Sequence, residues 1–131
     1  NIAVEADGLI ERIDFSDAEM LILPGGQTKL GECSALRELL VAHNNADKPI
    51  AAICAAPAVL GKLGILKGKQ ATCYPGFQDA LGESYVGGLV VESKNIITAK
   101  GPGLSADFAF CIIEHIKGSD VADAVYDAAQ Y

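Results

Sequence analysis

Apolar residues gather along this chain in short runs that end at polar or glycine-rich turns, a pattern typical of buried strands. The clearest runs are AEMLIL at 18–23, which stops at Pro24-Gly25-Gly26, and PIAAI at 49–53. The pattern predicts strands at residues 2–5, 18–23, 49–53, 70–73, 86–92 and 95–99. The last two flank Ser93-Lys94, as a hairpin or as two adjoining strands.

Between these runs the apolar spacing becomes helical. Leu36, Leu39 and Leu40 recur at helical intervals within residues 34–44. Ser105 is a suitable N-cap for a helix that continues to Lys117 and ends at Gly118. Further helices are predicted at residues 55–63 and 121–131, with a short helical turn at 77–81.

Strands that alternate with helices, and central strands that are apolar on both faces, predict an α/β fold. We expect one domain over residues 1–131, with a mostly parallel sheet covered on both sides. Ligands of such sheets bind beyond the carboxyl ends of the strands. The chain begins at Asn1 inside an apparent strand, so we expect the N-terminal part of the domain to be missing.

Composition narrows the classes of partner. Half of the residues are apolar and the formal net charge is −7. The sequence shows no basic cluster, which disfavours a nucleic acid partner. It also shows no apolar run of membrane-spanning length and no signal peptide, so we expect a cytoplasmic protein without a membrane partner. The cysteines form no C-x-x-C pair and only two histidines occur, so we expect free thiols and no metal site.

Cys54 is the residue with the clearest chemical potential, because it lies between the predicted strand 49–53 and the predicted helix 55–63. A nucleophile on such a sharp turn requires small residues two positions to either side, and Ala52 and Ala56 meet that requirement. At a helix N-terminus the dipole favours the thiolate. The alternative is an inert cysteine buried among alanines, and position alone does not separate the two.

Backbone N–H groups near Cys54 are candidates to bind an oxyanion. The Gly25-Gly26 loop ends a neighbouring predicted strand, and Ala55 directly follows the cysteine. Their N–H groups would stabilise negative charge that develops beside Cys54. Pro-Gly-Gly is equally common in ordinary turns, so the motif is weak by itself.

The sequence offers no clear general base for Cys54. His43 ends one helix and His115 lies in a late one, and each is expected at the surface or in helix packing. Glu32 is expected to be solvated at the start of a surface helix. Cys33, Cys73 and Cys111 are expected to be structural, with Cys111 in the core and Cys73 a candidate for the same rim as Cys54.

Motifs spread over the whole chain carry a family resemblance. They are LPGG at 23–26, AAICAAP at 51–57, ATCYP at 71–75, and TAKGPG at 98–103 followed by DFA at 107–109. In this order they resemble the ThiJ/PfpI superfamily, in particular the DJ-one branch of the parkinsonism-associated protein deglycase. The resemblance implies a flavodoxin-like three-layer α/β sandwich, usually a homodimer.

The same resemblance assigns roles to individual residues. It implies that Cys54 is the reactive elbow cysteine and that Gly26 and Ala55 supply the N–H groups around it. Gly25, Tyr74 and Pro102 are then expected at the rim of the pocket.

Three departures from the family pattern qualify these roles. The acidic partner of the cysteine, a Glu on the first helix of the family, would lie before Asn1. Tyr74 stands where some members place a His, which weakens a Cys–His dyad. Ala55 stands where the protease-like branch places a His, which argues against a peptidase.

Three functions remain open from the sequence. The first is a cofactor-independent glyoxalase or protein deglycase, in which Cys54 attacks methylglyoxal, another small 2-oxoaldehyde, or a glycated protein. The second is an oxidative-stress sensor or chaperone-like protein whose Cys54 is oxidised without turnover. The third is a scaffold in which Cys54 is buried and inert.

Overall fold

A computed structural model of the protein describes residues 2–131, and its centre is one mostly parallel sheet. The strands, in their order across the sheet, are β1 (Leu21–Leu23), β2 (Ile50–Ile53), β4 (Ile96–Ala99) and β3 (Val90–Ser93). β1, β2 and β4 run parallel, and β3 pairs antiparallel with β4. β3 and β4 therefore form a hairpin, which is one of the two arrangements that the sequence predicts. β3 begins later in the chain than predicted.

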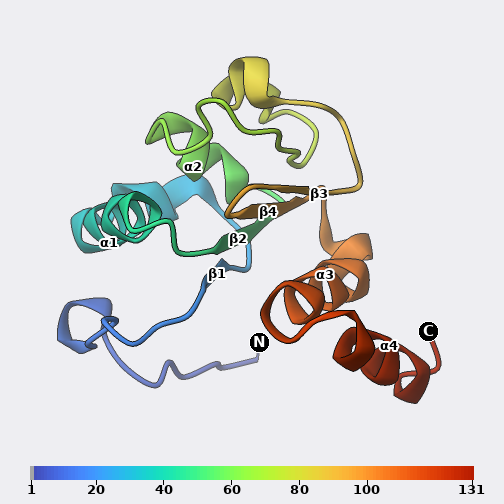
Figure 1. The fold of residues 1–131 in the computed structure, drawn as a ribbon. Helices are drawn as coiled ribbons and strands as arrows, with labels where there is room; N and C mark the ends of the chain where they lie inside the picture. The colour runs from blue at the N-terminus through green and yellow to red at the C-terminus, as the bar shows by residue number, and fades with distance from the viewer. Residues whose placement is uncertain (1) are drawn as a thin grey trace.

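Helices cover both faces of this sheet (Figure 1). α1 (Ser34–Asn45) and α2 (Pro57–Lys62) lie on one side, and α3 (Ser105–Lys117) and α4 (Ser119–Ala128) lie on the other. The arrangement confirms the predicted flavodoxin-like α/β fold. The short 3₁₀ helices are η1 (Ile10–Arg12), η2 (Thr28–Glu32), η3 (Gln78–Ala80), η4 (Gly82–Ser84) and η5 (Pro102–Leu104). Within residues 2–131, every helix is too short or too polar to cross a bilayer.

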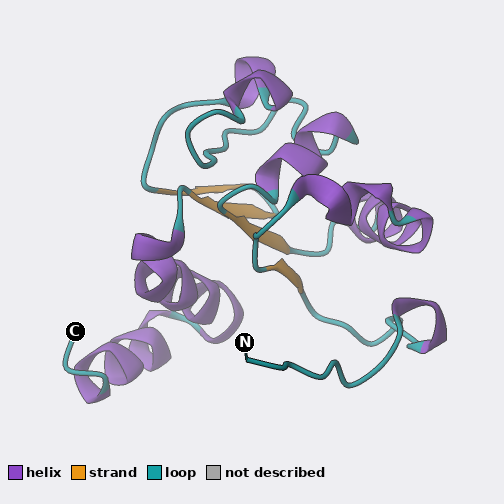
Figure 2. Cartoon of the chain, turned by 180° about the vertical axis from the view of Figure 1, so that it is seen from behind, coloured by secondary structure: helices purple, strands orange, loops and turns teal. Residues whose placement is uncertain are grey.

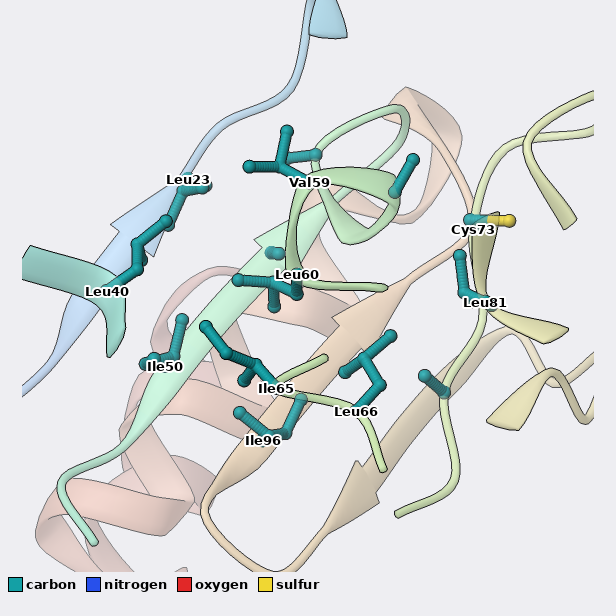
Figure 3. Packing of buried hydrophobic residues seen from close by; sticks show 14 of the residues in the cluster. Leu23, Leu40, Ile50, Val59, Leu60, Ile65, Leu66, Cys73, Leu81 and Ile96 are labelled. Atoms are coloured by element: carbon teal, nitrogen blue, oxygen red, sulfur yellow. The ribbon is translucent and has the colours of Figure 1, made fainter. Parts of the chain in front are cut away.

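The central strand β2 explains the two apolar layers. Successive side chains of a strand point to opposite faces. Ile50 and Ala52 accordingly join the core under α1 and α2, whereas Ala51 and Ile53 join the core under α3. The first core includes the fully buried Leu40, Leu60 and Ile96 (Figure 3). Burying each such side chain contributes roughly 1.5–3 kcal/mol.

Helix α3 covers the second core through Phe108 and Ile112. It ends where the sequence predicts, because Gly118 adopts φ +86, a conformation that glycine accepts without strain. The predicted cap at Ser105 is wrong. Ser105 is the first helical residue, and its hydroxyl donates to the Pro102 carbonyl at 2.7 Å, because η5 runs directly into the helix.

Two predicted strands are absent from the described part of the chain. Residues 2–5 run as loop (Figure 2), with Ile2 and Val4 93% and 90% exposed and no strand beside them to pair with. Residues 70–73 form only an isolated bridge between Ala71 and Tyr85. Ala71 bonds through both its N–H and its carbonyl to the segment around Tyr85, whereas on the other side of residues 70–73 the N–H of Thr72 donates to the Thr98 hydroxyl and not to a backbone carbonyl.

Candidate functional site

Cys54 sits where β2 turns sharply into α2. It adopts φ +67, a left-handed conformation that is uncommon for residues with a side chain. Its N–H donates to the Ala99 carbonyl at 2.9 Å, and the N–H of Ala56 donates to Ile53 at 3.2 Å. The thiol side chain is partly exposed. Strain of this kind costs about 1–3 kcal/mol and persists where the surroundings hold it.

Small residues make the turn possible, as the sequence suggests. Ala52 and Ala56 are fully buried in the first core, so neither position has room for a larger side chain. Gly25, from the loop after β1, approaches from the side. A β-carbon added there would lie 2.9 Å from the Ile53 oxygen and 3.0 Å from the Cys54 Cβ. The Cys54 turn is therefore packed tightly from two directions.

A pocket lies near the Cys54 turn, although Cys54 itself is not among the residues that line it. The N–H of Tyr74 donates to the Cys54 carbonyl at 2.9 Å, which ties the segment carrying Tyr74 to the turn. Tyr74 and Pro102 both line a pocket of about 300 Å³, together with Pro75 and the rest of residues 100–104. We call this the Tyr74 pocket. Its wall is close-fitting, since a β-carbon at Gly101 would lie 3.2 Å from the Tyr74 ring.

The two backbone N–H groups that are expected to bind an oxyanion, those of Ala55 and Gly26, differ in their surroundings. Within residues 2–131, no backbone carbonyl accepts a hydrogen bond from the N–H of Ala55. Gly26 follows Gly25 with φ +94, and a β-carbon added at Gly26 would meet nothing within 4 Å. Gly26 therefore borders open space at the edge of the turn. The roles of Gly26 and Ala55 in binding an oxyanion stay predictions.

Neither histidine is brought to the Cys54 turn. His43 is buried, and its Nε2 lies 3.1 Å from the Pro49 carbonyl, at the opposite end of β2 from Cys54. The Nδ1 of His115 pairs with a Glu92 carboxylate oxygen at 2.7 Å on the α3 side of the sheet. Glu32 is exposed and ends η2 instead of opening a helix. The residues that line the Tyr74 pocket include no Asp, Glu or His.

Among the other cysteines, Cys73 differs from Cys54 in burial, whereas Cys111 packs partly buried against the second core as Cys54 does. Cys73 is fully buried in the first core, so the suggestion that it shares the rim with Cys54 is wrong. Burial raises the pKa of Cys73. Burial, reinforced by the Glu92 carboxylate, raises the pKa of Cys111 to about 11, and this residue packs partly buried against the second core. Cys33 is partly exposed beside α1.

Two residues of this pocket carry no predicted role. Lys100 and Leu104 line the Tyr74 pocket, whereas the sequence predicts only Tyr74 and Pro102 there. The signal was available, because Lys100 lies inside the same motif as Pro102, directly after β4. Within residues 2–131, no three His, Cys, Asp or Glu side chains gather closely enough to hold a metal ion.

Comparisons with known proteins agree on one family. The model of the DJ-1/PfpI family matches residues 1–115. Protein DJ-1alpha of Drosophila melanogaster is 38% identical over 133 residues, which cover 97% of this chain and 61% of that protein. Glutathione-independent glyoxalase DJR-1.2 of Caenorhabditis elegans is 36% identical over 112 residues, covering 82% of this chain and 60% of that protein. The chain thus spans less than two thirds of the length of either relative.

Solved structures of the same family share the fold of this chain. The structure of oxidized DJ-1 from Toxoplasma gondii superposes with a TM-score of 0.92 at 32% sequence identity. The match covers 99% of this chain and 73% of that one. On the match to the family model, the similarity to relatives and the shared fold, this chain belongs to the DJ-1/PfpI family.

Proposed function

We propose that this protein is a cofactor-independent glyoxalase or protein deglycase that acts on methylglyoxal or its adducts through Cys54. The observation that carries the proposal is the partly exposed Cys54 at φ +67, on a strand-to-helix turn whose carbonyl accepts a hydrogen bond from Tyr74, a residue of the Tyr74 pocket. A relative that is 36% identical carries the name glutathione-independent glyoxalase, which supports the same class of reaction.

The chemistry begins with addition of the Cys54 thiolate to the aldehyde carbon. A C–S bond forms, the carbonyl π electrons move to oxygen, and protonation of that oxygen gives a hemithioacetal. A base then removes the hydrogen from this carbon and a proton is delivered to the neighbouring ketone carbon. The first carbon is thereby oxidised to a thioester and the second reduced to an alcohol. Water cleaves the thioester, which releases lactate and restores the thiol.

The residues around the turn suit the first step. Negative charge develops on the substrate oxygen during the addition, and N–H groups of Gly26 and Ala55 are proposed to stabilise it. Gly25, Tyr74 and Pro102 are proposed to form the rim that holds the remainder of a small 2-oxoaldehyde. Because oxidation and reduction occur within the substrate, the reaction requires no redox cofactor.

The proton transfer between carbons needs a general acid–base within hydrogen-bond reach. No Asp, Glu or His lines the Tyr74 pocket within residues 2–131. We propose that a carboxylate from outside these 131 residues supplies this function.

The test follows the covalent step and the product separately. Protein is incubated with methylglyoxal, and the adduct is located by mass spectrometry of peptides, with Cys54→Ser as the control. We expect an adduct on Cys54 that is absent from the Cys54→Ser control. We also expect lactate release when the carboxylate proposed to come from outside these 131 residues is supplied. Adducts confined to lysine and arginine, equal in both proteins, would overturn the proposal.

A second function is favoured by the same lack of an acid–base group at the pocket. Cys54 would then act as a sensor of oxidative stress, passing from thiolate to sulfenic and sulfinic acid without turnover. In that case peroxide would oxidise Cys54, while methylglyoxal would yield no lactate even with an added carboxylate. Lactate release that depends on Cys54 distinguishes the enzyme from the sensor.

A further inference from the structure

A second pocket, separate from Cys54, lies at the opposite end of the parallel strands. It has a volume of about 690 Å³, within the range of small-molecule sites. Pro49 and Asn95, the residues directly before β2 and β4, line it, whereas Cys54 and Lys100 directly follow the same two strands. The length of strands β2 and β4 therefore separates this pocket from the Cys54 thiol.

Three lysines face this second pocket, which we call the lysine pocket: Lys67, Lys69 and Lys94. Lys67 and Lys69 come from the loop after α2, and Lys94 comes from the turn between β3 and β4. The Lys94 ammonium reaches across to that loop, since it lies 4.0 Å from the position of a β-carbon at Gly68. A chain with ten Lys and Arg residues and a net charge of −7 thus gathers three cations in one hollow.

Hydrogen bonds hold one of these cations in place. The Lys69 Nζ donates to the Asn44 side-chain oxygen at 2.6 Å. The Asn95 amide donates to the same oxygen at 3.4 Å and to the Lys48 carbonyl at 3.0 Å. An ammonium has three donors, of which Asn44 accepts one. Lys69 is therefore positioned in the wall of the pocket with donors to spare for a ligand.

Carboxylates do not neutralise the three lysines. Within residues 2–131 the ion pair at 4.0 Å or less is that of His115, which also lines the pocket, with Glu92, and it involves none of the three lysines. Asp47 is the one acidic residue in the lining. Burial lowers the pKa of Lys69, the charge of Lys94 lowers it further, and Asp47 only opposes these effects. The pocket thus retains an excess of positive charge that a bound anion would relieve.

From this geometry we infer that the lysine pocket binds a small molecule that carries a phosphate group. A phosphate monoester carries close to two negative charges and several acceptor oxygens, which suit several ammonium donors better than one carboxylate does. A nucleic acid is disfavoured because the chain as a whole carries a net charge of −7. Inorganic phosphate and a phosphate ester share the chemistry, and binding measurements separate them.

The experiment is calorimetric titration of the whole chain with inorganic phosphate and, separately, with glycerol phosphate. The test variant is Lys67→Gln/Lys94→Gln, which keeps the bond between Lys69 and Asn44. The control is Lys29→Gln/Lys117→Gln, which removes the same charge from exposed positions elsewhere. We expect saturable binding that weakens about tenfold or more in the test variant and less than about twofold in the control.

A second readout does not depend on folding of a variant. In the unmodified chain, the side-chain amide signals of Asn44 and Asn95 should shift in nuclear magnetic resonance spectra as either ligand is added. Cys54→Ser should bind as the parent does, so this inference stands or falls separately from the proposed reaction. Binding of the ester alone would identify the ester as the ligand class. No saturable binding of either ligand, or equal loss in both double variants, would overturn the inference.

Discussion

At the scale of single residues, the backbone of Cys54 is held from both sides. Its N–H bonds to Ala99 of β4, and its carbonyl accepts a hydrogen bond from Tyr74. These two bonds keep a left-handed conformation that alone is unfavourable for a residue with a β-carbon. The turn that carries the thiol is therefore held in place, and the Cys54 side chain packs partly buried against the second core.

The first prediction concerns the order in which the cysteines react. Cys54 should be alkylated and oxidised first, because Cys73 is buried and Cys111 has a pKa of about 11. At neutral pH such a value leaves about one thiolate in ten thousand at Cys111. Cys33 is the real competitor, since it too is partly exposed. Mass spectrometry after limiting peroxide measures the order, and earlier modification of any other cysteine would contradict it.

The second prediction compares two neighbouring glycines. Both have φ +94, so alanine at either position carries the same kind of backbone strain. Only at Gly25 would the new β-carbon also press on Cys54 and Ile53. We expect Gly25→Ala to lower the free energy of unfolding by roughly 1–3 kcal/mol more than Gly26→Ala and to slow alkylation of Cys54. Equal urea midpoints and equal alkylation rates would show that the contact at Gly25 is unimportant.

At the scale of elements, the turn at Cys54 depends on close packing of β2 and α2 against the first core. Ala52 belongs to the strand and Ala56 directly precedes the helix, and both are fully buried. Valine at either position would overpack the core, so we expect a loss of roughly 1–3 kcal/mol in the free energy of unfolding. Denaturant midpoints measure it. Ala109→Val, at an exposed position of α3, is the control, and equal midpoints for all three would argue against a tight turn.

The junction of α1 and β2 provides a pH-dependent contact. His43 is 5% exposed, and its Nε2 must carry a hydrogen because it bonds to the Pro49 carbonyl. Desolvation lowers the pKa of His43 below that of an exposed histidine, and the charge of Lys48 adds to the effect. The folded state therefore binds fewer protons than the unfolded state just below about pH 6.5.

It follows that the free energy of unfolding decreases as the pH falls through about 6.5, and that this loss levels off below the folded pKa. Urea titrations from about pH 8 to pH 5 measure the effect. His43→Gln should remove this component of the pH dependence, and His115→Gln should retain it. The same slope in the parent and in His43→Gln would show that another group is responsible.

At the scale of the whole molecule, the two ends of the parallel strands carry chemically different sites. Cys54 and the Tyr74 pocket follow the carboxyl ends of β2 and β4, and the lysine pocket precedes their amino ends. Within the described residues, the lining of the Tyr74 pocket contains no Asp, Glu or His that could serve the proton transfer proposed above.

We therefore predict that the 131-residue chain alone forms the Cys54 adduct but releases no lactate from methylglyoxal. The assay is enzymatic measurement of lactate, with Cys54→Ser as the blank. Turnover by the isolated chain that disappears in Cys54→Ser would show that the proton carrier lies within these residues, and that a carboxylate from outside is not required.

Much of the fold follows from the sequence because its causes are local. The double-sided apolar runs predict β1, β2 and the layered sheet, helical spacing predicts α1 and α3, and Gly118 marks the end of α3. The small residues around Cys54 likewise predict the turn, since steric limits there act over a few positions. Boundaries are less well predicted, as α4 begins two residues earlier than expected.

Tertiary structure decided whatever depends on partners distant in sequence. Residues 70–73 look like a strand, but a strand requires a ladder of backbone bonds, and the Thr98 hydroxyl takes the N–H of Thr72. The same segment carries Cys73 into the core instead of to the rim. The sequence shows no basic cluster, yet folding brings Lys94 over the loop that holds Lys67 and Lys69, and Asn44 fixes Lys69 from 25 residues away. Charge and burial act through space, so these sites exist only once the strands and loops have been assembled.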